Sequence, residues 1–317
     1  MKVSAFSIIT NVTKFGYPYI ESIKSWLPVA DELVIIDGGS TDGSIEEIEK
    51  IGDKKIRIVS DSETKWEDDW SYWRMGKNFS RGYHECVGDI IIKFDIDYVL
   101  HEDAYLKQDK ENNMRIQFQR AIDDNQLIIS FNRFNFAILD RYYIKSEKTL
   151  AVNRDACKRR NIPVDYGLDP KRWAWGYEPI VANEEKNKIK TGTLLRTSGN
   201  TMIFSKIKVF NYGFCFSTKE QVAWARQRHL LAEVRQKSLG SNIDVEYNLE
   251  KLKTNKTIGL RNHIRDVKGY LENRHCTKLI IEEHPKVMWD LIRNLKPEQQ
   301  GYNLWNKFAK AIYYVKS

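Results

Sequence analysis

One stretch of the sequence limits the possible folds more than any other, the run from Gly88 to Asp97. Branched apolar residues dominate it, and such a run is typical of a strand covered on both faces in a parallel sheet. Asp95 and Asp97 follow one residue apart, so in extended backbone their side chains point to the same side. Open α/β sheets bind ligands at the carboxyl ends of their strands. The run therefore predicts two carboxylates able to hold a divalent cation and a diphosphate, with a plain surface turn as the competing interpretation.

Strand-like and helix-like segments alternate through the first third of the chain. The loop at residues 37–44 combines glycines, which let backbone approach a ligand, with Ser and Asp residues that can cap a helix. Alternation at this spacing predicts an α/β fold with a mostly parallel sheet flanked by helices. The expected strands are residues 2–10, 33–36, 56–59, 127–131, 134–136, 142–144 and 149–154, and the expected helices are residues 17–27, 45–50 and 111–123.

The composition is that of a globular protein large enough to be an enzyme. Of its 317 residues, 42% are hydrophobic and 30% are charged, a balance that is not typical of disordered or membrane-spanning chains. No stretch approaches the roughly 20 apolar residues of a transmembrane helix. The amino terminus shows no signal peptide, and the four cysteines share no C-x-x-C spacing. We therefore expect a cytoplasmic protein with reduced thiols. Peripheral association of this protein with a membrane stays open.

Charge divides the chain into an acidic beginning and a basic end. Residues 1–100 carry 12 Lys and Arg against 18 Asp and Glu, whereas residues 201–317 carry 21 against 11. We expect a catalytic domain at residues 1–216 and a basic helical region at residues 217–317. Basic surfaces attract nucleotides, nucleic acid or anionic lipid, although these helices could also simply cap the catalytic domain. The helices expected there are residues 219–239, 245–253, 258–274, 285–293 and 297–314.

Four motifs follow one another in the first hundred residues. They are a first strand ending Ile9-Thr10-Asn11, the stretch from Asp31 to Gly43, Lys77-Asn78, and Gly88-Asp89 leading into Phe94-Asp95-Ile96-Asp97. In this order they resemble the family 2 glycosyltransferases of GT-A fold, including sugar transferases of the bacterial or viral lipopolysaccharide type. The resemblance is clear over residues 3–105 and continues more loosely to about residue 230.

The resemblance implies a nucleoside-diphosphate sugar, with a UDP-sugar favoured, lying across the carboxyl ends of the strands. Thr10 and Asp37, with their neighbours Asn11 and Gly38, are then expected to line the nucleotide pocket. Asp95 is expected near the ribose or phosphate, and Asp97 is expected to hold Mn²⁺ or Mg²⁺ against the diphosphate.

Two basic residues are candidates for the phosphates of the same donor. Lys77 comes shortly before the motif strand, and its alternative is an exposed position on a helix. Arg154 could face the diphosphate, and its alternative is a structural salt bridge.

Two positions depart from the family pattern. Gly38 stands where many members carry a second acidic residue that recognises the base, so the identity of the base stays open. Asn211 stands where many relatives carry a histidine before Tyr-Gly, sometimes as a metal ligand. An amide oxygen can bind Mg²⁺ or Mn²⁺, so Asn211 joins Asp95 and Asp97 as an expected ligand. His229 is expected to lie too far along the following helix to replace that histidine.

An inverting transferase needs a carboxylate base that deprotonates the acceptor hydroxyl as this hydroxyl attacks the anomeric carbon. The candidates are Asp165, Asp169 and Glu178, with Glu178 narrowly favoured. They lie on a loop rich in Pro, Gly and Trp, and flat aromatic rings of this kind suit a sugar acceptor.

The sequence is thus interpreted as a metal-dependent, inverting glycosyltransferase. Its acceptor would be a hydroxyl of a saccharide or of a lipid-linked molecule, giving a glycan, glycolipid or surface polysaccharide. Two alternatives stay open. The basic end favours sugar transfer to hydroxylated bases in DNA, and Gly38 with Asn211 favours a non-catalytic module that binds nucleotide sugars or glycans.

Overall fold

The computed structural model describes residues 1–60, 72–161, 164–165, 180–181, 201–238, 258–273 and 276–299. A large mixed sheet forms the centre of this part of the chain, and two short strands pair separately. The strands of the large sheet are β1 (Val3–Ile9), β2 (Glu32–Asp37), β3 (Ile56–Ser60), β4 (Ile90–Lys93), β5 (Tyr98–Leu100), β6 (Ile128–Ile138), β7 (Arg141–Asn153), β10 (Thr201–Asn211) and β11 (Thr277–Lys278), and the separate pair is β8 (Val164–Asp165) with β9 (Ile180–Val181).

The sheet has the strand order β3-β2-β1-β4-β7-β6-β10-β5, with β11 added alongside β7. From β3 to β4 all neighbours are parallel, so the carboxyl ends of these four strands meet at one edge. Beyond β4 the pairing becomes mixed, because β7 runs antiparallel to both β4 and β6, and β10 runs parallel to β6. The predicted α/β class is confirmed, with the parallel half built from the strands that the apolar runs predict.

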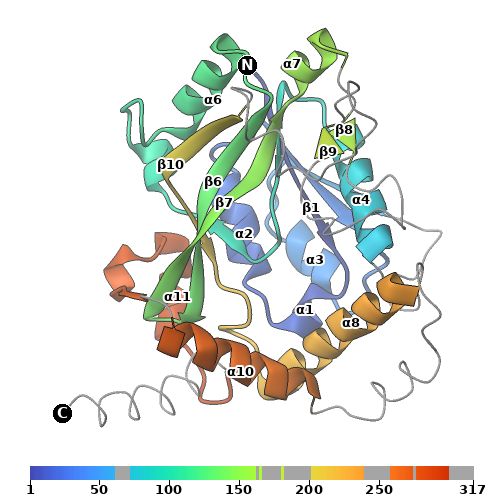
Figure 1. Ribbon diagram of the computed structural model, residues 1–317, viewed down its shortest axis with the longest axis vertical. Helices are drawn as coiled ribbons and strands as arrows, with labels where there is room; N and C mark the ends of the chain where they lie inside the picture. The colour runs from blue at the N-terminus through green and yellow to red at the C-terminus, as the bar shows by residue number, and fades with distance from the viewer. Residues whose placement is uncertain are drawn as a thin grey trace.

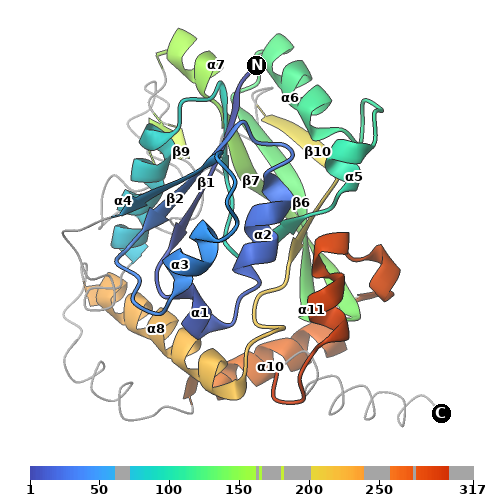
Figure 2. The same ribbon diagram turned by 180° about the vertical axis from the view of Figure 1, so that it is seen from behind.

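Helices cover both faces of the sheet. They are α1 (Val12–Phe15), α2 (Tyr19–Trp26), α3 (Ser44–Glu49), α4 (Tyr72–Glu85), α5 (Asp103–Leu106), α6 (Met114–Asp123), α7 (Arg154–Arg159), α8 (Lys219–Ser238), α10 (Ile258–Asn273) and α11 (Trp289–Arg293). Figure 1 and Figure 2 show the sheet between these layers from opposite sides, with α2 and α3 in front of it in Figure 2.

Alternation along β1 explains the two layers. Val3 and Ala5 belong to a core that includes residues of α2, α3 and α6, whereas Phe6 belongs to a core with residues of α4, α7 and α8. Side chains of a strand point to opposite faces in turn, so one buried strand supplies both cores. This is the reason that its sequence is apolar throughout rather than alternating.

The basic helical region begins on top of the first helix of the chain. Ser217, just before α8, donates a hydrogen bond from its hydroxyl to the carbonyl of Phe15 at 2.5 Å, and Gln221 bonds the carbonyl of Thr13 at 3.3 Å. Arg226 of α8 pairs with Asp266 of α10 at 3.2 Å. Helix α8 therefore lies against α1, and α10 lies beside α8 next to β6 and β7, as Figure 1 shows.

Most predicted boundaries of the described elements are accurate to a few residues, and two differences concern the long strands. Residues 127–131 and 134–136 are parts of the one strand β6, and residues 142–144 and 149–154 belong to the one strand β7, apart from Arg154, which begins α7. The expected helix at 245–253 and most of that at 297–314 lie outside the described residues. Within the described ranges, no helix is both long enough and apolar enough to cross a membrane.

Candidate functional site

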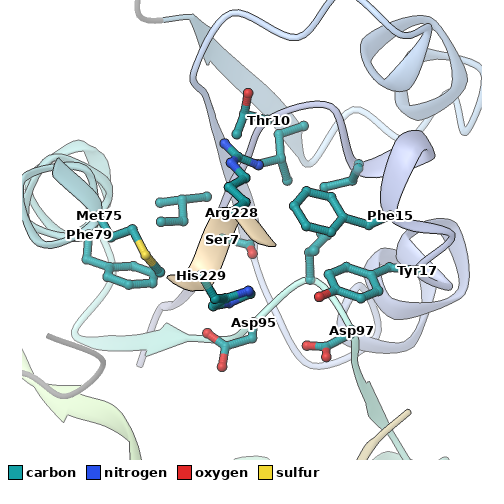
Figure 3. A pocket seen from close by; sticks show the side chains of 14 residues that line it. Ser7, Thr10, Phe15, Tyr17, Met75, Phe79, Asp95, Asp97, Arg228 and His229 are labelled. Atoms are coloured by element: carbon teal, nitrogen blue, oxygen red, sulfur yellow. The ribbon is translucent and has the colours of Figure 1, made fainter. Parts of the chain in front are cut away.

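A cavity of about 170 Å³ opens at the carboxyl ends of β1 and β4. Three segments that are far apart in the sequence build its polar wall, and Figure 3 shows their side chains converging. They are the end of β1, the turn after β4 and the middle of α8. The polar lining residues are Ser7, Thr10, Asp95, Asp97, Arg228 and His229, and the aromatic ones are Phe15, Tyr17 and Phe79.

Asp95 and Asp97 lie on a tight turn that carries the chain from β4 into β5. The amide of Phe94 bonds the carbonyl of Phe6 at 3.1 Å, and the amide of Tyr98 then bonds the carbonyl of Asp95 at 2.8 Å. Both aspartates line the same cavity, as their spacing predicts. The turn interpretation and the ligand-site interpretation are therefore compatible, because the turn itself presents the carboxylates.

Two buried hydroxyl groups lie in the wall that β1 forms. Ser7 is fully buried and Thr10 is 3% exposed. Within the described part of the chain, neither hydroxyl oxygen has a hydrogen-bond partner. Buried polar atoms are almost always bonded, so two such atoms at one cavity are typical of a place where a ligand supplies the partner.

The glycine loop after β2 is tied together by the predicted residues themselves. The Asp37 carboxylate accepts hydrogen bonds from the amides of Gly39 at 3.2 Å and Ser40 at 3.0 Å, and the amide of Gly38 bonds the carbonyl of Ile9 at 2.9 Å. Asn11 accepts a bond from the amide of Thr41 at 2.7 Å. Asp37, Asn11 and Gly38 thus shape the loop next to Thr10, and none of the three is among the residues that line the cavity.

Helix α8 brings into the cavity a cation that the sequence analysis does not single out. Arg228 is buried, and its guanidinium carbon lies 5.3 Å from the centre of the Phe15 ring and 5.6 Å from that of Trp224. Such a stacked, buried guanidinium is well suited to recognising phosphate.

His229 lines the same cavity, but among the described residues it does not join Asp95 and Asp97 as a group of three metal-ligating side chains. Helix α8 passes the carboxyl ends of the strands at the cavity. The separation of His229 from the strands along the sequence therefore does not indicate its distance from them in space. Burial lowers the pKa of His229 to about 4, so the ring is neutral near pH 7. Its Nδ1 donates to the carbonyl of Ala225 at 2.8 Å, which leaves Nε2 as the unprotonated nitrogen.

Other predicted residues lie outside this wall. The Asn211 amide donates to Asn135 at 3.0 Å and accepts from the amide of Gly213 at 3.0 Å, so both of its polar atoms have protein partners. Lys77 is exposed on α4. Arg154 lies at the amino end of β4, where its guanidinium bonds the carbonyl of Cys86 at 2.6 Å, which is the opposite end of the strand from Asp95. The structure therefore brings neither Asn211 nor Arg154 to the cavity.

The predicted catalytic carboxylates are only partly within the described residues. The main chain of Asp165 pairs with Ile180 in the β8-β9 ladder. Its side chain, Asp169 and Glu178 lie outside the described residues.

The oxygen atoms at the cavity fit a hard divalent cation whose remaining ligands come from a phosphate-bearing substrate and from water. In the ranges that the structure describes, no three His, Cys, Asp or Glu side chains come together as a ready-made metal site. Mg²⁺ is commonly held by one or two carboxylates, with phosphate and water oxygens completing its shell. Asp95 and Asp97 match that pattern, beside two buried hydroxyls for which the described ranges offer no hydrogen-bond partner.

No protein-family model and no curated protein matches this chain. Among solved structures, S. aureus TarS 1–349 in complex with UDP-GlcNAc aligns with a TM-score of 0.42 and 13% identity, covering 86% of this chain and 76% of that one. The mannosyltransferase PcManGT from Pyrobaculum calidifontis, in complex with GDP-Man and Mn²⁺, aligns with a TM-score of 0.41 and 13% identity, covering 96% and 83%.

Proposed function

We propose that this chain is a metal-dependent, inverting glycosyltransferase. Its donor would be a nucleoside-diphosphate sugar, with a UDP-sugar favoured, and its acceptor a hydroxyl of a glycan or glycolipid. The observation that supports the proposal is one cavity, at the carboxyl ends of parallel strands, whose lining combines two carboxylates, a buried guanidinium and two hydroxyls that have no hydrogen-bond partner among the described residues. A sugar diphosphate presents to such a cavity the hydroxyls, phosphates and metal-binding oxygens that these groups require.

Each group has a proposed role in donor binding. Ser7 and Thr10 hydrogen-bond the nucleoside, and Arg228 faces the phosphates. Asp95 and Asp97 are the candidate ligands of Mn²⁺ or Mg²⁺. A cation bound there would act as a Lewis acid that stabilises the negative charge on the departing diphosphate.

The acceptor side would supply the base. One of Asp165, Asp169 and Glu178 takes the proton of the acceptor hydroxyl while the bond between the anomeric carbon and the diphosphate oxygen breaks. We favour Glu178. A Glu178→Gln variant should then keep the wild-type nucleotide affinity and lose turnover by at least about 100-fold. Full turnover in that variant would return the role to one of the two aspartates.

A thermal-shift panel tests the donor site. UDP, GDP, CDP and dTDP are each added with Mn²⁺, with Mg²⁺ and with EDTA to the wild type and to Asp97→Asn. A ligand at about 100 times its dissociation constant stabilises the folded state by roughly 2.7 kcal/mol, which raises the melting temperature measurably. We expect one nucleoside diphosphate to stabilise the wild type only when metal is present.

Asp123→Asn on the exposed face of α6 is the matched control, since it makes the same substitution away from the cavity. It should behave as the wild type, whereas Asp97→Asn should lose the metal-dependent shift. If no diphosphate stabilises the wild type with either metal, the proposal of a metal-dependent donor site is refuted.

A further inference from the structure

A second cavity, of about 420 Å³, opens beside the first one, which Asp97 lines. Its walls come from the turn between α1 and α2, the start of α8 and the residues that follow α11. Tyr17 lines both cavities, and its ring stacks on Phe15 with the ring centres 5.0 Å apart. Burial and the nearby charge of Asp97 raise the pKa of the Tyr17 hydroxyl, which Figure 3 shows on the side of the first cavity. A ligand of the second cavity would therefore lie next to a ligand of the first.

Hydrogen bonds between distant segments hold the walls of the second cavity in place. The Gln221 amide group donates to the carbonyl of Thr13 at 3.3 Å, and its oxygen accepts from the main-chain amide of Thr218 at 2.8 Å. The Gln299 side chain donates to the carbonyl of Phe216 at 2.8 Å. Ligand pockets are usually preformed and measure roughly 300–1000 Å³. The second cavity has the size and the fixed walls of such a pocket.

Glu21 is the residue of this cavity whose chemistry calls for a ligand. Its side chain is half-buried, and burial raises the pKa of its carboxyl group. The charge of Lys24, on the same helix, opposes that rise, but the described residues provide no ion pair for Glu21. A carboxylate that is partly removed from water is stabilised by N–H or O–H donors. A ligand that carries hydroxyl groups would supply these donors.

The rest of the lining selects among classes of ligand. The charged residues are Glu21, Glu298 and Lys296, so negative charges outnumber positive ones and a phosphate or a nucleic acid would be repelled. Tyr19 and Phe216 add two buried aromatic side chains. Aromatic rings pack against the apolar face of a sugar ring, while carboxylate and amide groups bond its hydroxyls. This combination favours a neutral saccharide.

We propose that the second cavity binds a neutral saccharide, as the part of the acceptor that does not itself react. The reacting hydroxyl would then lie on the side of Tyr17, towards the donor. This inference rests on the proposed function and narrows its acceptor to a saccharide of more than one unit. Binding of a remote unit helps to orient the reacting hydroxyl, which is how non-reacting parts of a substrate contribute to rate.

Saturation-transfer difference NMR on the full chain detects such binding without turnover. The probes are cellobiose, maltose, lactose and chitobiose, and inorganic pyrophosphate is the anionic competitor. We expect at least one disaccharide to bind and pyrophosphate not to displace it. Glu21→Gln should weaken this binding by about 10-fold, because hydrogen bonds to a charged acceptor are stronger than those to a neutral one. Glu49→Gln removes the same charge from an exposed position on α3 and should bind as the wild type does.

Asp97→Asn separates the two cavities, because it changes the first one only. This variant should keep the wild-type affinity for the disaccharide. The inference is overturned if no disaccharide binds, or if Glu21→Gln binds as tightly as Glu49→Gln. Loss of disaccharide binding in Asp97→Asn would also overturn it, since the sugar would then occupy the first cavity. The thermal-shift panel with nucleoside diphosphates contains no saccharide acceptor, so it judges the proposed function separately.

Discussion

Gly82 offers a direct test of how closely α4 packs on the sheet. It lies in the interior of this helix, and a Cβ atom built there would be 2.2 Å from Cδ2 of the Phe6 ring and 2.7 Å from Cε2. Ordinary contacts of a Cβ begin near 3.4 Å, so the ring or the helix must move by about an ångström. Phe6 is fully buried on β1, between α4 and the neighbouring strands, and it has little room to move.

Two effects compete in Gly82→Ala. Replacing glycine by alanine inside a helix stabilises the folded state by about 1 kcal/mol. Overpacking a buried site costs about 1 to 3 kcal/mol. We therefore expect Gly82→Ala to be neutral or to destabilise the protein by up to about 2 kcal/mol. Gly269→Ala in α10 meets nothing within 4 Å and should gain the full helix propensity.

Urea unfolding of both variants, followed by tryptophan fluorescence, measures the difference. The expected difference in the free energy of unfolding between the two alanine variants is about 1 to 3 kcal/mol, seen as a lower midpoint for Gly82→Ala than for Gly269→Ala at an unchanged slope. Equal stabilisation by both substitutions would refute the close packing of α4 on Phe6. It would also weaken the cavity geometry, because Met75 and Phe79 of the same helix line that cavity.

Two further predictions concern buried polar groups. Thr10→Val keeps the shape of the side chain and removes a hydroxyl that has no partner within the described chain, so the free energy of unfolding in urea should not fall. The affinity for the nucleoside diphosphate should drop about 10-fold. Unchanged affinity would exclude Thr10 from the site. Burial, with the nearby charge of Arg226, lowers the pKa of His263 to about 3, against about 6.5 in the unfolded chain. Because the unfolded state binds the extra proton, stability should be complete above pH 6.5 and fall by about 2 kcal/mol by pH 5 on account of this residue. His263→Gln should remove this loss of about 2 kcal/mol between pH 6.5 and pH 5 from the free energy of unfolding, as measured in urea. The same pH dependence in the variant and the wild type would contradict the buried, neutral ring.

The parallel half of the fold could be predicted because its information is local. The apolar runs that form β1, β2 and β4 are buried on both faces of the sheet. A strand buried on both faces has consecutive apolar residues, and such a run can be recognised in the sequence alone. The long strands β6 and β7 were predicted in pieces, since polar residues such as Asn132 and Arg133 interrupt the apolar pattern of β6. Register shifts at these interruptions let the ladder continue, and only the partner strand reveals that.

The candidate site also has residues that could be predicted from the sequence and residues that could not. Asp95 and Asp97 could be predicted from their spacing of two residues directly after a buried strand. The basic character of the C-terminal helices could be predicted, but the sequence did not single out Arg228 as a residue of the cavity. Its place beside β1 depends on the packing of α8 against α1, which no local pattern records. Ser7 carried no signal, because a single serine in an apolar strand is common.

The cavity wall formed by α8 has a consequence for how the protein is made. Ser7, Thr10, Asp95 and Asp97 all leave the ribosome early, whereas Arg228 and His229 are synthesised only after β6, β7 and β10. A nascent chain that has already formed its parallel strands would therefore have an open, unfinished cleft. The ability to capture a ligand should appear late and abruptly during translation, once α8 has docked.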